Sequence, residues 1–518
     1  MGDTRVIVVG AGHNGLTAAT YLARAGVAVT LLERLPTVGG AAVSATAFPG
    51  VDAQLSRFSY LVSLMPKQII NDLGLDVRLI RRRYASYTPL PGGFQGLLVD
   101  HADPAGTAAS FACVGAVADV RGFNAFYERT GRMARALFPT MTGPLPTESE
   151  VRGMIGASEW EDFVERPINE VIERSVSHDL VRGVVASDAL IGTFAALDDP
   201  EREQNRCLLY HVIGGGTGHW DVPQGGMGAV TGGLKRVARA AGVEIVTNAE
   251  VTAITPDGEV TYREGDAEHR VRGDLVLAGV APAVLATLTG SATSGQARPE
   301  GAQLKVNMLL RRLPRTRERT MKPEAAFGGT FHINETYTQL VSAREAALAG
   351  RVPDPLPCEI YCHSLADRTI LGDGMGIDGF QTMTLFGLQV PDRLVDQLGN
   401  DVLREQAGAA ALASLNSVLD EPIEPLLALD ANGNPCLEVK TTRDVEHALN
   451  MPGGQIFHGP LSWPWLDDDA PRSTPAQRWG VDTEHDRILL CGSGSRRGGG
   501  VSGIGGHSAA MAALELIG

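Results

Sequence analysis

The chain has 518 residues, a formal net charge of −15 and an ordinary globular composition, with 44% hydrophobic and 20% charged residues. This composition excludes global disorder and a fibrous architecture, and the acidic balance opposes binding to a nucleic-acid backbone. At this length we expect more than one domain.

No apolar run reaches the roughly 18 to 20 residues that span a bilayer, and the first residues lack the pattern of a secretion signal. We therefore expect a cytoplasmic protein and, without a basic amphipathic helix, at most loose membrane association. The six cysteines include no CxxC pair, so the sequence predicts neither a disulfide framework nor a bound metal ion. Cys358 and Cys362, if they lie on one strand, would be about 13 Å apart.

The N-terminal segment carries a dinucleotide-binding pattern. A β-branched strand at residues 5–9 is followed by Gly10, Gly12 and Gly15 in GxGxxG spacing, and then by a helical segment that ends at Gly26. The three glycines permit a tight turn, a close approach of a pyrophosphate to the backbone, and close packing of helix on strand. The phosphates would lie at the N-terminus of the helix.

A second apolar strand, residues 27–33, ends in Glu33, whose carboxylate can accept hydrogen bonds from a ribose diol. Arg34 is expected to be solvated or to lie over the adenine rather than to bind an NADP phosphate. The paired Gly39 and Gly40 follow at a distance typical of FAD-binding proteins. The predicted cofactor is therefore FAD, and its expected contacts in this segment are Gly10, Ala11, Gly12, His13, Asn14, Gly15, Glu33, Arg34, Gly39, Gly40 and Ala41.

Two distant segments extend the pattern. In the middle of the chain, a helix at 229–241 leads to a strand at 244–247, and the edge of the next strand, at Val251, could read adenine through its backbone. Near the end, a strand at 488–491 precedes a loop with eight glycines and a terminal helix. The positive end of that helix would stabilise a reduced, anionic flavin.

These segments resemble the FAD-binding portions of the phytoene-desaturase-like flavoproteins, which include carotenoid desaturases, carotenoid isomerases and retinol saturases. The stretches FSYLVSLMPKQIINDLGL, PCEIYCHSLADRTI and GGQIFHGPLSW look like those of the branch whose substrates are mostly unassigned. The resemblance implies FAD contacts at Gly10, Gly12, Gly15, Glu33, Gly40, Val251, Gly492 and Val501. Two departures from the family are Thr37 or Val38 where an arginine is common, and Arg496-Arg497 in place of His-Pro.

The expected fold is α/β: a Rossmann-like FAD-binding domain of the glutathione-reductase type, discontinuous in sequence, with an inserted α+β substrate domain. Helix-period stretches predict a helical cover, and the runs QLKVNMLLRRL, GTFHINE, CEIYCHSL and FQTMTLFGLQV predict the strands of a mixed sheet over the flavin. The predicted parts are FAD-binding residues 1–95, 216–290 and 476–518, the helical cover 96–215, and the mixed-sheet substrate domain 291–475.

The expected activity is that of an FAD-dependent dehydrogenase or desaturase, in which a mostly apolar organic substrate loses a hydride to flavin N5. Three alternatives stay open: an oxidase of an amine, alcohol or ring that releases hydrogen peroxide, a polyene isomerase, and a non-catalytic flavoprotein scaffold. The expected partners are a small-molecule substrate and an external electron acceptor, either oxygen or a quinone; a homo-oligomer stays open. Without a CxxC or CxxxxC pair, a disulfide-reductase mechanism is excluded.

Several polar side chains are candidates for taking the substrate proton or anchoring the substrate. His219 lies beside a glycine-rich segment and Trp220, and His458 precedes two tryptophans. These two histidines and Arg496 are the predicted catalytic residues; the alternative for each histidine is a buried, hydrogen-bonded imidazole. Further candidates are Arg57, Arg497, and His332 and His363, both expected on strands.

Overall fold

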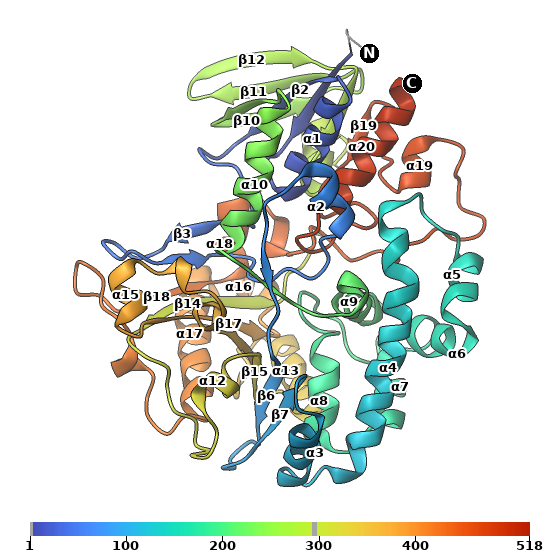
Figure 1. Ribbon diagram of the computed structural model, residues 1–518. Helices are drawn as coiled ribbons and strands as arrows, with labels where there is room; N and C mark the ends of the chain where they lie inside the picture. Colours follow the sequence, from blue (N-terminus) through green and yellow to red (C-terminus); the bar gives the residue numbers. More distant parts are fainter. Residues whose placement is uncertain (1–3, 293–297) are drawn as a thin grey trace.

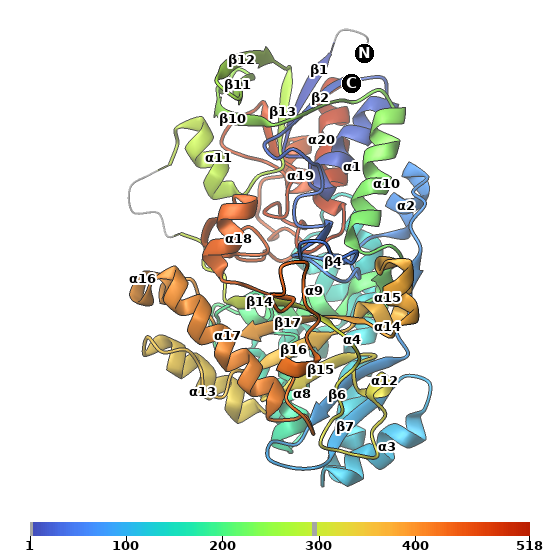
Figure 2. The same cartoon turned by 90° about the vertical axis from the view of Figure 1, so that its left-hand side faces the viewer.

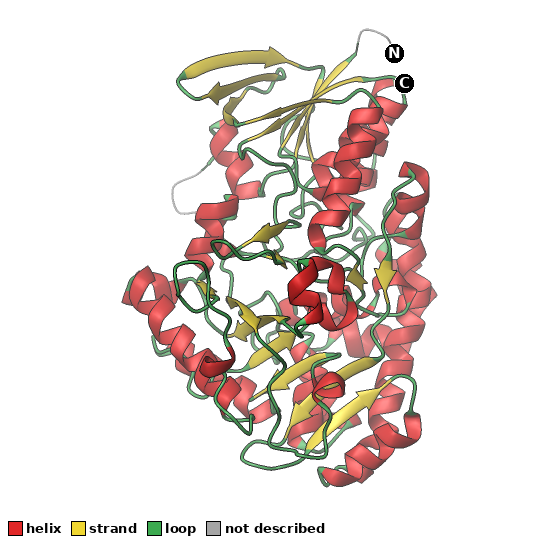
Figure 3. Ribbon diagram, turned by 60° about the vertical axis from the view of Figure 1, so that its left-hand side comes forward, coloured by secondary structure: helices red, strands yellow, loops and turns green. Residues whose placement is uncertain are grey.

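A computed structural model describes residues 4–292 and 298–518, and its strands gather at two opposite ends of the molecule (Figure 3). At one end lies a five-stranded parallel sheet in the order β19-β13-β1-β2-β9. Its inner strands β13, β1 and β2 are mostly apolar and buried on both faces, as expected for a parallel sheet. The bounds are β1 Arg5–Val9, β2 Ala28–Glu33, β9 Glu244–Thr247, β13 Leu275–Ala278 and β19 Ile488–Leu490.

Helices cover one face of this parallel sheet, and a small antiparallel sheet covers the other. On the helical face, α1 packs between α10 and α20. On the other face, Ile7 and Val9 of β1 share a core with Ile254 and Val260. The result is the α/β, Rossmann-like fold that the sequence predicts. The bounds are α1 His13–Arg24, α10 Met227–Ala240 and α20 Ile504–Ile517 for the helices, and β10 Ala249–Ile254, β11 Glu259–Glu264 and β12 Ala267–Arg272 for the small sheet.

The two ends of the described chain meet in this domain. Strand β19 completes the parallel sheet beside β13, and α20 packs along α1. Both views show the N-terminus and the C-terminus at the same end of the molecule (Figures 1 and 2). The domain is therefore assembled from segments nearly 500 residues apart, such as α1 and α20.

At the opposite end lies a seven-stranded mixed sheet, which we call the second sheet. Its strand order is β18-β14-β17-β16-β15-β6-β7. β6 and β15 pair in parallel, and the other neighbours are antiparallel. Helix α17 packs on β14, β17 and β18 (Figure 2). The bounds are β6 Tyr84–Pro89, β7 Gly96–Asp100, β14 Gln303–Leu310, β15 Thr330–Ile333, β16 Cys358–Tyr361, β17 Gln381–Leu388, β18 Leu437–Lys440 and α17 Asn400–Asn416.

A group of helices lies beside the seven-stranded sheet, on the right-hand side and at the bottom of Figure 1. These are α3 Pro104–Cys113, α4 Val120–Leu137, α5 Glu148–Ile155, α6 Ala157–Trp160, α7 Ile168–Ser175, α8 Asp179–Ser187 and α9 Glu203–Val212. Shorter or peripheral elements are β3 Ser44–Thr46, β4 Gln54–Ser56, α2 Lys67–Leu73, β5 Leu79–Ile80, β8 Val222–Pro223, α11 Pro282–Thr289, α12 Pro323–Ala326, α13 Tyr337–Leu348, α14 His363–Ala366, α15 Asp373–Ile377, α16 Arg393–Leu398, α18 Thr442–Leu449 and α19 Pro475–Trp479. Within the described ranges, no helix has the length and apolar character needed to cross a bilayer.

The structure differs from the sequence expectations at two places. The predicted boundary at residue 95 falls inside the β6–β7 hairpin, which belongs to the second sheet because β6 pairs with β15, far along the chain. The run CEIYCHSL is not one strand: β16 ends at Tyr361 and His363 begins α14. The turn is fixed because the Ser364 hydroxyl donates to Gln381 Oε1 at 2.6 Å and accepts from the Thr382 N–H at 2.9 Å.

Candidate functional site

The turn between β1 and α1 has the close backbone packing of a dinucleotide site. Gly10 has a φ of +94°, in the left-handed region, and its N–H donates to the Leu32 carbonyl at 2.8 Å. A Cβ on Gly15 would lie 2.0 Å from the Gly10 carbonyl oxygen, so only glycine lets α1 come this close. Within the described residues, a Cβ on Gly12 would meet no protein atom within 4 Å, because Gly12 faces a cavity.

The carboxylate of Glu33 is held firmly at the end of β2. It is buried, its Oε2 accepts from the Ala11 N–H at 2.7 Å, and its Oε1 accepts from the Leu35 N–H at 2.9 Å. Each oxygen keeps a free lone pair, so the carboxylate can still accept a hydroxyl pair from a ligand. Arg34 lies beside it, where Nη2 donates to the Ala448 carbonyl at 3.1 Å.

The paired glycines pack against the first turn. The Gly39 N–H donates to the Ala11 carbonyl at 2.8 Å, and a Cβ on Gly40, at a φ of +56°, would lie 3.3 Å from Gly12 Cα. Gly40 and Ala41 line the cavity, whereas Ala11 and Gly39, in the described structure, stand behind its wall. The hydrogen bond between these last two residues supports the turn.

The loop after β19 meets the same turn from the other end of the chain. His13 Nε2 lies 3.1 Å from the Gly500 carbonyl oxygen, and burial lowers the pKa of His13 to about 4, which keeps this imidazole neutral near pH 7. A Cβ on Gly506 in α20 would lie 2.0 Å from the Asn14 carbonyl oxygen. The first and last glycine-rich segments therefore form one continuous wall.

We expect Gly506→Ala to lower the free energy of unfolding by about 1 to 3 kcal/mol, because the new methyl group forces α20 away from α1. The matched control is Gly153→Ala in α5, where a Cβ would meet nothing within 4 Å. That helical change should raise stability by about 0.5 to 1 kcal/mol. Urea unfolding of both variants measures the difference; an equal response would show that α20 does not pack this tightly.

A cavity of about 280 Å³, the first cavity, opens where these segments meet. Besides the two glycine-rich loops, the start of β10 contributes to its lining. Its wall contains residues predicted as cofactor contacts from all three parts of the sequence: Gly10, Gly12, His13, Asn14, Gly15, Glu33, Arg34, Gly40, Ala41, Val251, Gly492 and Val501.

A second cavity, of about 480 Å³, adjoins the first. The two cavities share the lining residues Tyr60, Leu61, Ile191, His211 and Trp220. Among the other side chains around the second cavity are Arg82, Asp188, His332 and Glu359, together with aromatic rings such as that of Tyr127. This cavity therefore presents both charged groups and aromatic faces.

The structure separates the three predicted catalytic residues. His458 lines the first cavity, its Nδ1 is buried without a partner in the described structure, and burial lowers its pKa to about 4. His219 lines the second cavity and packs edge-on against His101, with ring centroids 4.8 Å apart. Arg496 lines neither cavity of the described structure; its Nη1 donates to the Trp465 carbonyl at 2.7 Å.

The other candidates have different surroundings. Arg57 forms a 2.5 Å ion pair with Glu438, and buried Arg497 donates to two backbone carbonyls, which are structural roles. His363 is buried, and burial lowers its pKa to about 3. His332 lines the second cavity beside two glutamates.

Sequence reasoning missed Lys305, which lines the first cavity. Its Nζ is buried, has no hydrogen-bond partner in the described structure, and lies 4.6 Å from the Tyr60 ring centroid and 4.2 Å from that of Phe386. Burial lowers the pKa of Lys305 well below its usual range. The available signal was a lysine inside a strand, QLKVNMLL, of otherwise uncharged residues.

Comparison with known proteins places the chain in a family. A model of the NAD(P)-binding Rossmann-like domain matches residues 8–68. An uncharacterised protein of Mycobacterium tuberculosis (strain ATCC 25618 / H37Rv) is 53% identical, covering 99% of this chain and 98% of its own. Pyridine nucleotide-disulfide oxidoreductase domain-containing protein 2 of Rattus norvegicus is 28% identical, covering 97% and 92%.

Among solved structures, cyclohexylamine oxidase from Brevibacterium oxydans is similar, with a TM-score of 0.55 and 15% identity over 100% of both chains. At this identity, the similarity shows a shared fold. The relationship by sequence is closer: the chain belongs to the same family as the M. tuberculosis protein, and it carries an NAD(P)-binding Rossmann-like domain.

Proposed function

We propose that this chain is an FAD-dependent oxidoreductase, a dehydrogenase or desaturase of the phytoene-desaturase-like group. The observation that carries the proposal is the first cavity, whose wall is built from the first glycine-rich turn, the start of β10 and the loop after β19. Three sequence segments that the FAD pattern singles out thus meet around one space. A chance arrangement of glycines would not bring them together.

The residues present fit this dinucleotide. Gly12 leaves open space at the start of α1, where backbone N–H groups and the helix dipole favour a pyrophosphate. The fixed carboxylate of Glu33 would accept the hydroxyls of the adenosine ribose, and Val251 would lie by the adenine. Gly492 and Val501, near the start of α20, would line the flavin end.

When bound, the flavin supplies a two-electron acceptor for a hydride from the substrate. We assign the substrate to the second cavity because the wall shared by the two cavities, which includes Tyr60 and Trp220, is the boundary between cofactor and substrate space. Trp220 is held there by its Nε1–H, which donates to the His211 carbonyl at 3.1 Å. The aromatic rings would exclude water from the reacting carbon.

The lining of the second cavity refines the expectation of a mostly apolar substrate. Its aromatic rings suit an apolar body, while Arg82, Asp188 and Glu359 suit a polar or charged group on the same molecule. The substrate class that fits is an organic compound with an apolar skeleton and at least one polar function. The electron acceptor in this proposal is oxygen or a quinone.

A second candidate, an amine oxidase, is favoured by Asp188. Its carboxylate lines the second cavity, and within the described ranges no side chain pairs with it. Burial raises the pKa of this carboxyl, so a cationic ligand would stabilise its ionised form. The rings of Tyr127 and Trp220 line the same cavity and could contact an ammonium group through their faces.

The test is to purify the protein, release and identify its flavin, and add metabolite fractions without oxygen. We expect FAD, and bleaching of the oxidised flavin by a fraction that holds the substrate. Turnover without any bleaching would refute the redox proposal. Release of hydrogen peroxide in air would favour the oxidase, and a product with the mass of its substrate would instead indicate isomerisation.

A further inference from the structure

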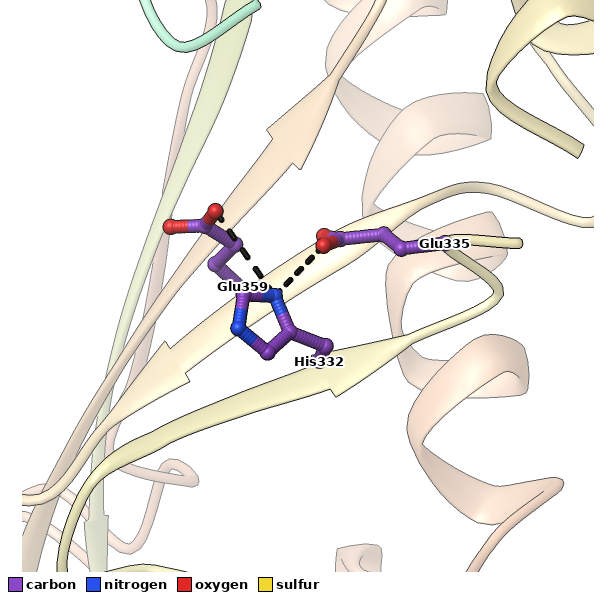
Figure 4. Close-up of side chains that lie close together, drawn as sticks. All are labelled: His332, Glu335 and Glu359. Atoms are coloured by element: carbon purple, nitrogen blue, oxygen red, sulfur yellow. Dashed lines mark hydrogen bonds and ion pairs between the residues drawn. The ribbon is translucent and has the colours of Figure 1, made fainter. Parts of the chain in front are cut away.

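Three buried side chains gather at the wall of the second cavity, on neighbouring strands of the second sheet (Figure 4). His332 lies on β15, Glu335 follows that strand, and Glu359 lies opposite His332 on β16. His332 Nδ1 is 2.6 Å from Glu335 Oε2 and 3.8 Å from Glu359 Oε1. His332 and Glu359 line the cavity, and Glu335 stands behind them.

The cluster continues toward the wall shared with the first cavity. The Tyr361 hydroxyl donates to Glu359 Oε2 at 2.5 Å. The Tyr361 ring contacts the Tyr60 ring, with centroids 4.4 Å apart, and Tyr60 lines both cavities. Glu359 is thus joined to a tyrosine on one side and to an imidazole on the other, directly beside the substrate space.

The cluster has too little positive charge for two ionised carboxylates. In the part of the chain that the structure describes, neither Glu335 nor Glu359 forms an ion pair with lysine or arginine, and Glu335 Oε1 has no partner. Two carboxylates that share one imidazole in a buried site repel each other unless a proton is retained. Burial and the neighbouring Glu335 raise the pKa of Glu359 to about 8. The geometry therefore favours retention of a proton in the cluster, and burial raises the pKa of Glu335 as well.

Several titratable or charged groups face Glu359 and determine the pKa of its carboxyl group. Asp188 and Glu335 favour the protonated form, whereas His332 and the Tyr361 hydrogen bond favour the ionised form. These groups are His332 and Glu335 from β15 and its following loop, Tyr361 and Cys358 from β16, Asp188 after α8, Cys207 from α9, and Tyr60 and Arg82 from the segments before β6.

We infer that Glu359 is the catalytic base of the oxidation proposed above. The inference rests on that proposed function. One substrate C–H bond would break, and its hydride, with both electrons, would go to the flavin when that cofactor is bound. A neighbouring N–H, O–H or C–H bond also breaks: its proton bonds to Glu359, and its electron pair becomes the new double bond. The substrate class is thus one that loses both a hydride and a proton.

The position of Glu359 suits this role better than those of the predicted histidines. One of its carboxylate oxygens is held by Tyr361, and the side chain faces the larger cavity beside the shared wall. His458 lines the other cavity, and His219 packs on His101 beside Arg81. A base must be within hydrogen-bond reach of the proton that it takes, so the substrate cavity is where the group belongs.

The first experiment needs no substrate. Infrared difference spectra of the flavin-loaded protein between about pH 6 and about pH 10 should show a carboxylic-acid carbonyl band that is lost with a midpoint near pH 8. Glu359→Gln should remove this band, and Glu359→Asp should retain a shifted one. The matched control Glu421→Gln, at the Arg312 ion pair, should leave the band unchanged. A wild-type spectrum without the band, or its survival in Glu359→Gln, would overturn the inference.

The second readout is anaerobic reduction of the flavin by the active metabolite fraction. We expect Glu359→Gln to keep the wild-type flavin content and its reduction by dithionite, but to react with the fraction about 10²- to 10⁴-fold more slowly. The wild-type rate should rise with pH through about 8, the variant should lose that rise, and Glu359→Asp should recover part of the rate. Equal rates in wild type and Glu359→Gln would overturn the inference.

These outcomes separate the two proposals. If no fraction bleaches the wild-type flavin although turnover persists, the redox function fails, whatever the infrared spectra show. If the wild type is bleached and Glu359→Gln matches it, only the assignment of Glu359 fails. A divalent metal ion retained in stoichiometric amount after dialysis would also overturn the inference, because the cluster would then hold a metal ion in place of a proton.

Discussion

A Gly12→Val variant is expected to fold normally and to be purified without bound flavin. Gly12 has a φ of −69° and a ψ of 177°, which valine adopts without strain, and its Cβ would meet no protein atom within 4 Å. The added side chain would instead occupy the open space at the start of α1, where the pyrophosphate is expected. We predict that flavin occupancy falls more than about tenfold, a loss of at least about 1.4 kcal/mol in binding free energy.

The measurement is the ratio of flavin to protein absorbance, together with circular dichroism to establish folding. Gly232→Val provides the control, since this glycine lies in α10 and a Cβ there would have only Arg236 Nη1, at 3.8 Å, as a neighbour. Gly15→Val is a poor test because its clash with the Gly10 carbonyl would disturb the fold itself. A yellow Gly12→Val protein with full flavin content would refute the assignment of the first cavity.

Lys305→Met is expected to raise the free energy of unfolding at neutral pH by about 2 to 4 kcal/mol. The wild-type ammonium loses its hydration in the fold, and Glu438 offsets this loss only in part. Because the folded-state pKa of Lys305 is depressed, the unfolded chain binds more protons than the folded chain at pH values between that depressed pKa and the ordinary lysine value of about 10.4. Wild-type stability should therefore rise with pH, by up to about 1.4 kcal/mol per pH unit from this group, until that value is passed.

Methionine at position 305 removes both the desolvation cost of the ammonium and the pH dependence that the lysine gives to the free energy of unfolding. The control is Lys67→Met at the exposed start of α2, which should change stability by less than about 0.5 kcal/mol. Urea unfolding at several pH values, with excess FAD held constant, measures both variants. A less stable Lys305→Met protein, or one with the wild-type pH slope, would show that the amine is stabilised by a partner. If the prediction holds, Lys305 destabilises the fold and is a candidate for a role in the first cavity, which it lines.

The sequence predicts the Rossmann-like part of the fold well because each feature there is local. A parallel strand must be apolar, and Gly15 and Glu33 satisfy constraints set within one βαβ unit. The predicted strands at 5–9 and 244–247 therefore match β1 and β9 residue for residue.

The second sheet is less predictable because its pairings are distant. β6 joins β15 across about 240 intervening residues, and no local pattern in residues 84–89 indicates this partner. Glu359 and Tyr361 look like ordinary alternation along a strand. Their importance follows only from the neighbours that the fold brings to them, above all His332 on the adjacent strand.

The late position of β19 and α20 in the sequence has a consequence for biosynthesis. On the emerging chain, β1, α1 and β2 leave the ribosome first, but the wall that they share with residues 488–517 cannot exist until translation has passed that segment. Binding of the proposed nucleotide would then follow translation of residues 488–517, and until that point the nascent protein would expose an incomplete site to chaperones and proteases.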